Sequence, residues 1–311
     1  MILAKKNKLP LFTYFFLGLG LLGGCAHGFS SSFGGRAPQS EVLRVGVQPN
    51  ESAKDLSELQ AEISKRMGRS VEFYKPSDYS QLVSEFKKGS IDFAFMTGLV
   101  FIEAEREANA KALLKKVYGK NEFYYSAILV NAQSKIKKVK DLKGKKFGFV
   151  DVKSTSGYLY PRVILRKNGL DAGEGLAPGE NILSSSFLGT HEKTLRALVE
   201  GKVDAVGVWA DEPSFKTGAW TEPPFAQDKK FKFRVLDYSD PIPNDVFVVR
   251  EQYFKANPML TLKFMETLIG LSEEPNNSLK KVFNVDRLTT ATSRHYDGVR
   301  ALGELLKEGK K

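Results

Sequence analysis

Short apolar segments alternate with segments of helical spacing along most of this 311-residue chain. Residues 43–47, 71–74 and 91–96 have the composition of buried or half-buried strands. The segments between them carry leucine, isoleucine or phenylalanine at intervals of three or four residues, which is typical of amphipathic helices. Strands that alternate with helices indicate an α/β fold with a mainly parallel sheet.

One pattern occurs twice in the chain. Residues 86–94 read FKKGSIDFA and residues 198–206 read LVEGKVDAV, so each copy ends a helix, turns at a glycine and opens a strand with an aliphatic residue and an aspartate. The repetition predicts two similar α/β lobes, for which the chain is long enough. Two such lobes hold a ligand at the carboxyl ends of their strands and close on it about a hinge. We expect Asp92 and Asp204, which begin their strands, to bond neighbouring backbone rather than a ligand.

The second half of the chain continues the alternation. Strands are predicted at 124–130, 146–150, 182–187, 203–208, 231–236 and 245–249. Residues 210–230 are rich in proline, glycine and acidic residues and indicate a loop. From Glu251 onward the spacing is helical, and we expect helices to the end of the chain.

The first residues resemble the signal peptide of a bacterial lipoprotein. Lysines precede an apolar run at 9–22 that is too short, and too interrupted by proline and glycine, to span a membrane. The run ends in Leu22-Gly23-Gly24-Cys25, a lipobox-like sequence, and Cys25 is the only cysteine, which rules out an internal disulfide. We therefore predict a signal peptide at 1–24, lipid attachment at Cys25 and a flexible tether at 25–41. The alternative is an ordinary signal peptide with an incidental thiol.

The positive charge of the chain is scattered. The formal net charge is +11, and the lysines are distributed along the sequence. A nucleic-acid-binding protein concentrates its basic residues in one patch, so the scatter, together with export, argues against a nucleic-acid partner. The excess charge instead mildly favours anionic ligands.

Three consecutive hydroxyl residues, Ser154, Thr155 and Ser156, lie between the strand predicted at 146–150 and a helix predicted at 157–167. The first backbone N–H groups of a helix have no partner within it, and the helix dipole makes this end partly positive. Hydroxyl donors at such a position predict a site for an oxyanion such as phosphate or phosphonate. The simpler alternative is that one of the two serines is only an N-cap.

Sequence signals for catalysis and for metal binding are absent. The histidines are His27, His191 and His295, and none has a metal-ligand spacing to other histidines or to acidic residues. The chain has no Gly-x-Ser-x-Gly elbow and no Walker-type loop. We therefore expect no catalytic residue, no metal and no cofactor. The enzymatic alternative is a phosphoester hydrolase with Ser154 as nucleophile and His191 as base.

Several motifs together resemble the periplasmic solute-binding components of phosphonate, phosphite and phosphate ABC importers. They occur in the order typical of that family over roughly residues 43–250. The most specific pair is Ser154-Thr155-Ser156-Gly157 followed by Gly189-Thr190-His191-Glu192. The other matching motifs are Asp78-Tyr79, Gly89-Ser90-Ile91-Asp92, Tyr124-Tyr125-Ser126-Ala127-Ile128-Leu129-Val130-Asn131, Pro161, Val203-Asp204 and Ile242-Pro243-Asn244-Asp245.

The resemblance implies a type II periplasmic-binding-protein fold, in which two α/β lobes are joined by two crossover strands with the ligand cleft between them. Placed on this chain, lobe 1 comprises residues 42–127 and 244–311, and lobe 2 comprises residues 128–243. Closure of such lobes is a population shift driven by contacts that exist only in the closed state.

The resemblance also assigns residues to the ligand. In this family the Ser-Thr-Ser helix start and the histidine hold the phosphorus oxyanion, and tyrosines add hydroxyl donors. By motif, these residues are Ser154, Thr155, Ser156, His191, Tyr79 and Tyr124. Hydrogen bonds to an ionised acceptor contribute roughly 1.5–3 kcal/mol each, so neutral donors suffice to hold an oxyanion without an arginine.

Further positions complete the expected ligand site. Asp245, in the Ile-Pro-x-Asp motif, lines the cleft and meets a cationic or hydroxyl substituent. Asp211 falls near an acidic residue that serves aminophosphonate binders, but the sequence around it departs from the asparagine-rich family pattern, which argues against an amine-bearing ligand. Thr97 follows a predicted strand at the place equivalent to Ser-Thr-Ser, and we expect it to touch the ligand. Trp209 either forms an apolar wall of the cleft or belongs to the core.

We therefore predict a lipid-anchored, monomeric solute receptor of the cell envelope that faces the periplasm or the cell exterior. It captures a phosphonate, phosphite or phosphate and delivers it to ABC permease subunits in the membrane. The sequence leaves two alternatives open, a ligand-sensing lipoprotein that signals to a membrane receptor and the phosphoester hydrolase named above.

Overall fold

The computed structural model describes residues 42–49, 53–228, 230–276, 278–283 and 285–308. These residues belong to one compact unit that runs from Ser40 to Lys311. The predicted signal peptide, the tether and Cys25 lie outside the described residues. Within the described ranges, none of the helices is both long and apolar enough to cross a membrane.

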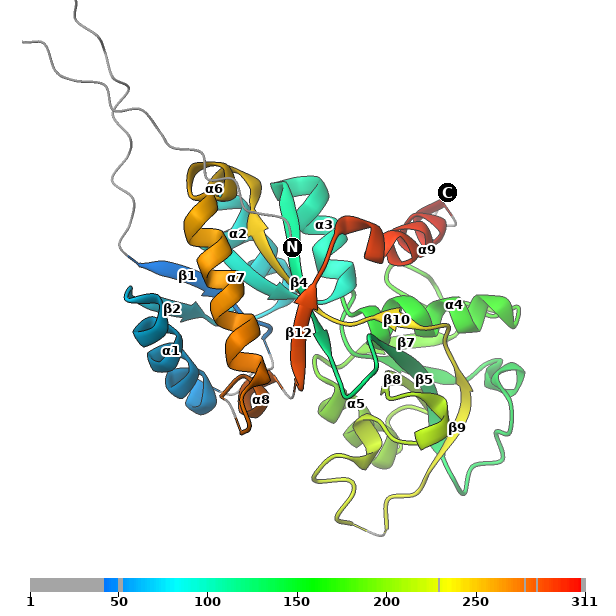
Figure 1. Ribbon diagram of the computed structural model, residues 1–311. Helices are drawn as coiled ribbons and strands as arrows, with labels where there is room; N and C mark the ends of the chain where they lie inside the picture. Colours follow the sequence, from blue (N-terminus) through cyan, green and yellow to red (C-terminus); the bar gives the residue numbers. More distant parts are fainter. Residues whose placement is uncertain (1–41, 50–52, 229, 277, 284, 309–311) are drawn as a thin grey trace, which may run out of the picture. The chain divides into compact units, whose positions relative to one another are not determined.

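The first of two sheets combines strands from both ends of the chain. Its strands are β1 (Leu43–Gly46), β2 (Val71–Tyr74), β3 (Phe93–Met96), β4 (Ala110–Val117), β11 (Val246–Arg250) and β12 (Arg287–Thr290). The order across the sheet is β12-β4-β11-β3-β1-β2. Figure 1 shows β1 and β2 at one side of this sheet and β4 and β12 at the other. β1 is parallel to β2 and β3, whereas β11 lies between β3 and β4 and is antiparallel to both.

The second sheet is formed by the middle of the chain. Its strands are β5 (Phe123–Asn131), β6 (Lys146–Phe149), β7 (Ser184–Phe187), β8 (Ala205–Ala210), β9 (Phe233–Tyr238) and β10 (Ile242–Pro243). The order is β10-β5-β8-β6-β7, and β9 also pairs with β5. The chain thus crosses from the first sheet to the second between β4 and β5 and returns between β10 and β11. The exact residues at which the lobes were predicted to begin and end remain a prediction.

Side chains that alternate along the strands give the first sheet a core on each face. The helices that pack on it are α1 (Ala53–Met67), α2 (Tyr79–Lys88), α3 (Gly98–Ala108), α6 (Glu251–Ala256), α7 (Pro258–Glu273), α8 (Ser278–Phe283) and α9 (Asp297–Glu308). On β3, Phe93 and Phe95 pack with α1, α7 and α8, whereas Ala94 and Met96 pack with α2, α3 and α9. This two-residue period is the one that a sheet covered on both faces requires.

The second sheet is covered in the same way. Its helices are α4 (Tyr160–Lys167), α5 (His191–Val199) and a π-helical turn, η2 (Thr155–Leu159), that runs into α4. On β5, Ile128 and Val130 pack with α4, and Ala127 and Leu129 pack with α5. Two α/β lobes, as predicted from the repeated pattern, therefore build the described part of the chain.

Two strands of the first sheet were not predicted, for different reasons. The prediction that the chain is helical from Glu251 to its end is wrong at β12. The four residues of β12 pair with β4 and are too few to show a hydrophobic period of their own. β4 has the sequence AKALLKKV, in which Lys115 and Lys116 are only 3% exposed. Because buried lysines are rare, a hydropathy pattern that contains two of them does not predict a buried strand.

The helix predicted at 157–167 is two elements. The π-helical turn η2 begins at Thr155, directly after its cap Ser154, and α4 begins at Tyr160 with Pro161 in its first turn. Proline lacks the N–H that a continuing helix would use and is suited to the first turn of a new one. The hydroxyl residues therefore start a π-helical turn rather than a regular α-helix.

Candidate functional site

A cavity of about 360 Å³ is lined by residues of both lobes. It falls in the size range of small-molecule sites. Every residue that the sequence predicted for the ligand lines it, namely Tyr79, Thr97, Tyr124, Ser154, Thr155, Ser156, His191, Asp211 and Asp245. The sequence did not predict the other lining residues in this role, which are Gln48, Lys116, Tyr118, Glu222, Asn244, Val282 and Phe283, while Trp209 was left open. The structure thus brings the predicted residues together, and their contact with a ligand stays a prediction.

The hydroxyl groups of Ser154 and Thr155, at the start of η2, accept hydrogen bonds from different backbone N–H groups. The Ser154 hydroxyl accepts a hydrogen bond from the Gly157 N–H at 3.0 Å and is an N-cap, as the simpler alternative held. The Thr155 hydroxyl accepts from the Leu99 N–H of the other lobe at 2.9 Å, which leaves its own hydrogen to donate. Between the described residues, no hydrogen bond uses the backbone N–H of Thr155 or Ser156. These groups are the unpaired donors that a helix start offers to an anion.

Tyr124, on β5, remains a hydrogen-bond donor at physiological pH. Burial, reinforced by the negative charge of Asp245, raises the pKa of Tyr124 well above its ordinary value. A hydrogen bond from the Ser156 hydroxyl to Tyr124 opposes this rise. The phenol therefore stays protonated, and its O–H is available to an acceptor in the cavity. Tyr79, the first residue of α2, is also buried against the cavity.

His191 is a neutral donor by its position. It is the first residue of α5, and its Nδ1 accepts a hydrogen bond from the Trp209 N–H at 3.3 Å. The proton of the neutral ring therefore lies on Nε2. Burial lowers the pKa of His191 to about 4, so the ring is uncharged at pH 7. His191 therefore adds an N–H donor to the hydroxyl and backbone donors, without a positive charge.

A buried ion pair faces the same cavity. Asp245 Oδ2 accepts from Gln48 Nε2 at 2.7 Å and from Lys116 Nζ at 3.2 Å. The Lys116 side chain is 4% exposed, and its Nζ lies 5.1 Å from the centre of the Phe283 ring. Lys116 is on β4, the strand that the sequence pattern did not reveal, so the partner of Asp245 could not be foreseen.

Two further acceptors of the cavity, Asp211 and Asn244, lie in loops. Asp211 Oδ2 accepts from the Thr217 hydroxyl at 2.6 Å, so part of this carboxylate is already used within its own loop. Asn244 is fully buried, and its Nδ2 donates to the Asn121 carbonyl at 3.2 Å. Asn244 Oδ1 has no hydrogen-bond partner within the part of the chain that the structure describes. An orphaned buried acceptor is rare in proteins and is satisfied by a ligand or a water.

Asp92, Asp204 and His295 are not among the residues that line the cavity. Asp204 accepts a hydrogen bond from the Lys146 N–H at 2.8 Å, as expected, and Asp92 pairs with the Arg250 side chain at 2.7 Å, so both have structural partners. His295 is exposed and bonds locally to Thr292. The described ranges contain no group of three or more histidine, cysteine, aspartate or glutamate side chains that could hold a metal ion.

The sequence matches a known family over most of its length. The profile of the family described as "ABC transporter, phosphonate, periplasmic substrate-binding protein" matches residues 45–296. The "Phosphate-import protein PhnD" of Mycolicibacterium smegmatis is 29% identical over 191 residues, which cover 57% of this chain and 60% of that protein. The "Probable ABC transporter phosphite binding protein PhnD1" of Prochlorococcus marinus is 22% identical over 288 residues, which cover 86% of this chain and 90% of that protein. The match to the first relative thus spans less than two thirds of its length.

A solved structure shares the fold. The structure of PhnD1 from Prochlorococcus marinus in complex with methylphosphonate superposes with a TM-score of 0.71 at 19% identity, and the match covers 86% of this chain and 98% of that one. Similarity at this identity establishes the fold alone. The type II periplasmic-binding-protein fold predicted from the sequence, two α/β lobes joined by two crossovers, is confirmed.

Proposed function

Since this chain belongs to the family of phosphonate periplasmic substrate-binding proteins of ABC transporters, we propose that it captures a small phosphorus oxyanion in the cavity and delivers it to an ABC permease. The observation that carries the proposal is the convergence of hydroxyl, phenol, imidazole and backbone donors on one cavity. All of these donors are neutral, and each hydrogen bond to an ionised acceptor contributes roughly 1.5–3 kcal/mol. A few such bonds suffice for a receptor that must also release its ligand.

The arrangement of Ser154 and His191 favours binding over hydrolysis. A serine nucleophile needs a base that removes its proton. Here the Ser154 hydroxyl is bonded to the Gly157 N–H, and the acceptor nitrogen of His191 is occupied by the Trp209 N–H. Neither group is set up to activate the other. We therefore propose that the ligand leaves chemically unchanged.

The partners follow from the same proposal. We propose a monomer attached to the membrane through an acylated Cys25, on the periplasmic or outer face of the cell envelope, where it meets the permease. Acylation is tested by mass spectrometry of the protein purified from its host membrane, with Cys25→Ser as the control. A Cys25 of unmodified mass would contradict the anchor and leave the ligand site untouched.

Calorimetric titration tests the ligand. The soluble form that starts after Cys25 is titrated with phosphate, phosphite and methylphosphonate, with sulfate as the control anion. We expect at least one phosphorus oxyanion to bind with a Kd of about 1 μM or tighter, and His191→Ala to weaken it at least tenfold because a donor is lost. His295→Ala, which replaces an exposed histidine away from the cavity, should leave the affinity unchanged. Absence of binding by every phosphorus oxyanion to the folded protein would overturn the proposal.

A further inference from the structure

The acidic residues at the cavity suggest at first a place for a cation. Asp211, Glu222 and Asp245 all line it, and a carboxylate would stabilise the ammonium group of an aminoalkylphosphonate. Asp245, however, already has a cation. Its Oδ2 lies 3.2 Å from Lys116 Nζ, and the Gln48 amide donates to the same oxygen. We propose that the Lys116–Asp245 pair makes this receptor select phosphorus oxyanions whose substituent carries no positive charge, an inference that rests on the proposed function.

Both the backbone and the side chain of Lys116 bond to Asp245. The Lys116 N–H donates to the Asp245 carbonyl at 3.0 Å, so the two residues are joined through both backbone and side chain. The side chains are 4% and 18% exposed, so the pair is largely shielded from solvent. Burial makes a broken pair costly, because each charge would be left without its partner.

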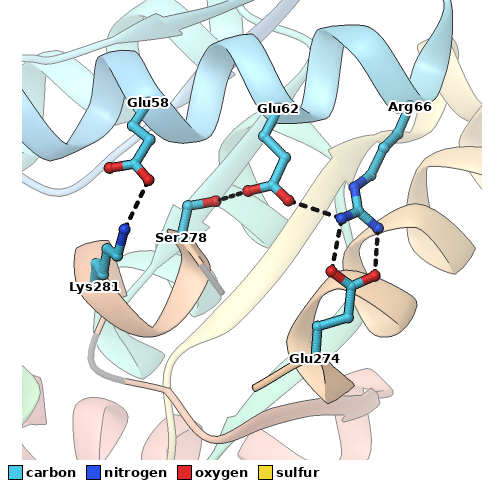
Figure 2. Close-up of polar contacts among 6 residues, drawn as sticks. All are labelled: Glu58, Glu62, Arg66, Glu274, Ser278 and Lys281. Atoms are coloured by element: carbon cyan, nitrogen blue, oxygen red, sulfur yellow. Dashed lines mark hydrogen bonds and ion pairs between the residues drawn. The ribbon is translucent and has the colours of Figure 1, made fainter. Parts of the chain in front are cut away.

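The ring beside Lys116 is itself anchored. Phe283 is the last residue of α8, and polar contacts tie α8, and Glu274 at the end of α7, to α1 (Figure 2). Glu58, Glu62 and Arg66 follow one face of α1. Their partners are Lys281 at 2.7 Å from Glu58, Ser278 bonded to Glu62, and Glu274, which forms a two-pronged pair with Arg66 at 2.7 and 2.8 Å. The Phe283 ring therefore keeps its position against the ammonium group, where it adds a cation–π contact.

A ligand ammonium would meet two obstacles at Asp245. It would approach a carboxylate whose charge Lys116 balances, and it would stand close to the Lys116 ammonium, which repels it. The neighbouring acceptor, Asn244 Oδ1, is neutral, so it offers an ammonium group a hydrogen bond but no opposite charge. A methyl group or a hydrogen in the same place meets neither obstacle.

The test compares ligands of equal shape and different charge. Ethylphosphonate is matched with aminomethylphosphonate, and propylphosphonate with 2-aminoethylphosphonate, by titration calorimetry at pH 7. We expect the wild type to bind the uncharged member of at least one pair at least tenfold more tightly. Lys116→Met keeps an unbranched side chain beside Phe283 but removes the cation that balances Asp245, and we expect it to shift the ratio of affinities at least tenfold toward the amine.

Two further variants keep the test decisive. Lys115→Met is the matched control, because Lys115 is equally buried but pairs with Glu122 and does not line the cavity, and it should keep the wild-type ratio. If Lys116→Met does not fold, Lys116→Gln, which still donates to Asp245, should shift the ratio in the same direction.

Each remaining outcome overturns the inference. A wild type that binds the amines as tightly as their isosteres, or a folded Lys116 variant with an unchanged ratio, contradicts it and leaves the proposed function standing. A wild type that takes methylphosphonate but no member of either pair also contradicts it, because size would then set the selectivity. A wild type that binds no phosphorus oxyanion at all removes the proposed function and the inference with it.

Discussion

At the scale of single residues, the cavity depends on groups that stay neutral. Burial keeps the Tyr124 phenol protonated, and burial keeps the His191 ring uncharged. A neutral donor binds an anion without leaving an unpaired buried charge behind when the ligand leaves. Lys116, the one positively charged residue named at the cavity, forms an ion pair with Asp245.

The pKa of His191 predicts a dependence of stability on pH. Burial lowers this pKa from 6.5 to about 4, so between these values the unfolded chain binds a proton that the folded protein does not. The free energy of unfolding therefore falls as the pH drops through this window. His191→Gln cannot titrate and should lose roughly 2 kcal/mol less than the wild type between pH 7 and pH 5. Urea denaturation of the ligand-free proteins measures this.

The control for this prediction is the exposed histidine. His295→Gln should follow the pH dependence of the wild type. If His191→Gln and the wild type lose the same stability on acidification, then His191 is not held neutral by the fold and the description of the donors is wrong.

At the scale of elements, the turn after β6 has no space for a larger residue. A Cβ on Gly157 would lie 2.4 Å from Val150 Cγ2 and 2.7 Å from Ser154 Oγ. The glycine thus lets η2 start against the end of the strand, with its first N–H groups at the cavity. Close packing, rather than an unusual φ angle, is the reason for a glycine here.

Gly157→Ala should therefore affect both fold and site. We expect a loss of about 1–3 kcal/mol in the free energy of unfolding, because the added methyl group overpacks the turn. Oxyanion affinity should fall at least tenfold, since the donors of η2 move with it. Gly179→Ala is the control, because a Cβ there meets no atom within 4 Å. Equal stability of the two variants in thermal denaturation would refute this account of the turn.

Much of this element-level picture could be predicted, and the exceptions have physical causes. Ser154-Thr155-Ser156 and His191 stand in local patterns, a strand end and a helix start, that remain visible in a single sequence. Lys116 does not, because its strand is defined by pairing with β11 and β12, which lie far along the chain. Asp245 was predicted to line the cleft, but the group that balances its charge depends on this long-range pairing.

At the scale of the whole described unit, polar contacts join the lobes beside the cavity. Lys153, next to Ser154, pairs with Glu103 of α3 at 2.5 Å, and its carbonyl lies 3.5 Å from the Thr97 hydroxyl. Apolar residues of the α4 region, Leu159 and Tyr160, also pack into the cluster formed by α3 and α9. Contacts of this kind favour the arrangement in which both lobes line the cavity.

Removing one of these contacts should loosen the receptor. Glu103→Gln is expected to weaken oxyanion binding roughly fivefold, mostly through faster dissociation, because a partly exposed ion pair contributes about 1 kcal/mol. Stopped-flow dissociation measures the rate, and small-angle scattering of the ligand-free protein should show a larger radius of gyration. Glu85→Gln, which breaks a pair within α2, should change neither quantity. Unchanged dissociation in Glu103→Gln would show that the pair plays no part in holding the lobes together.

The position of β11 has a consequence for the order in which the chain folds. β11 lies between β3 and β4, so a chain that emerges N-terminus first contains β1, β2 and β3, which pair directly, but not the strand that joins β4 to them. The strands of the second sheet, from Phe123 to Pro243, are contiguous and are all available before β11 appears. The second sheet therefore has all of its strands before the first sheet has β11. Because β4 cannot join β1, β2 and β3 until β11 is present, we expect the first sheet, and with it that lobe's part of the cavity, to be completed after the second sheet.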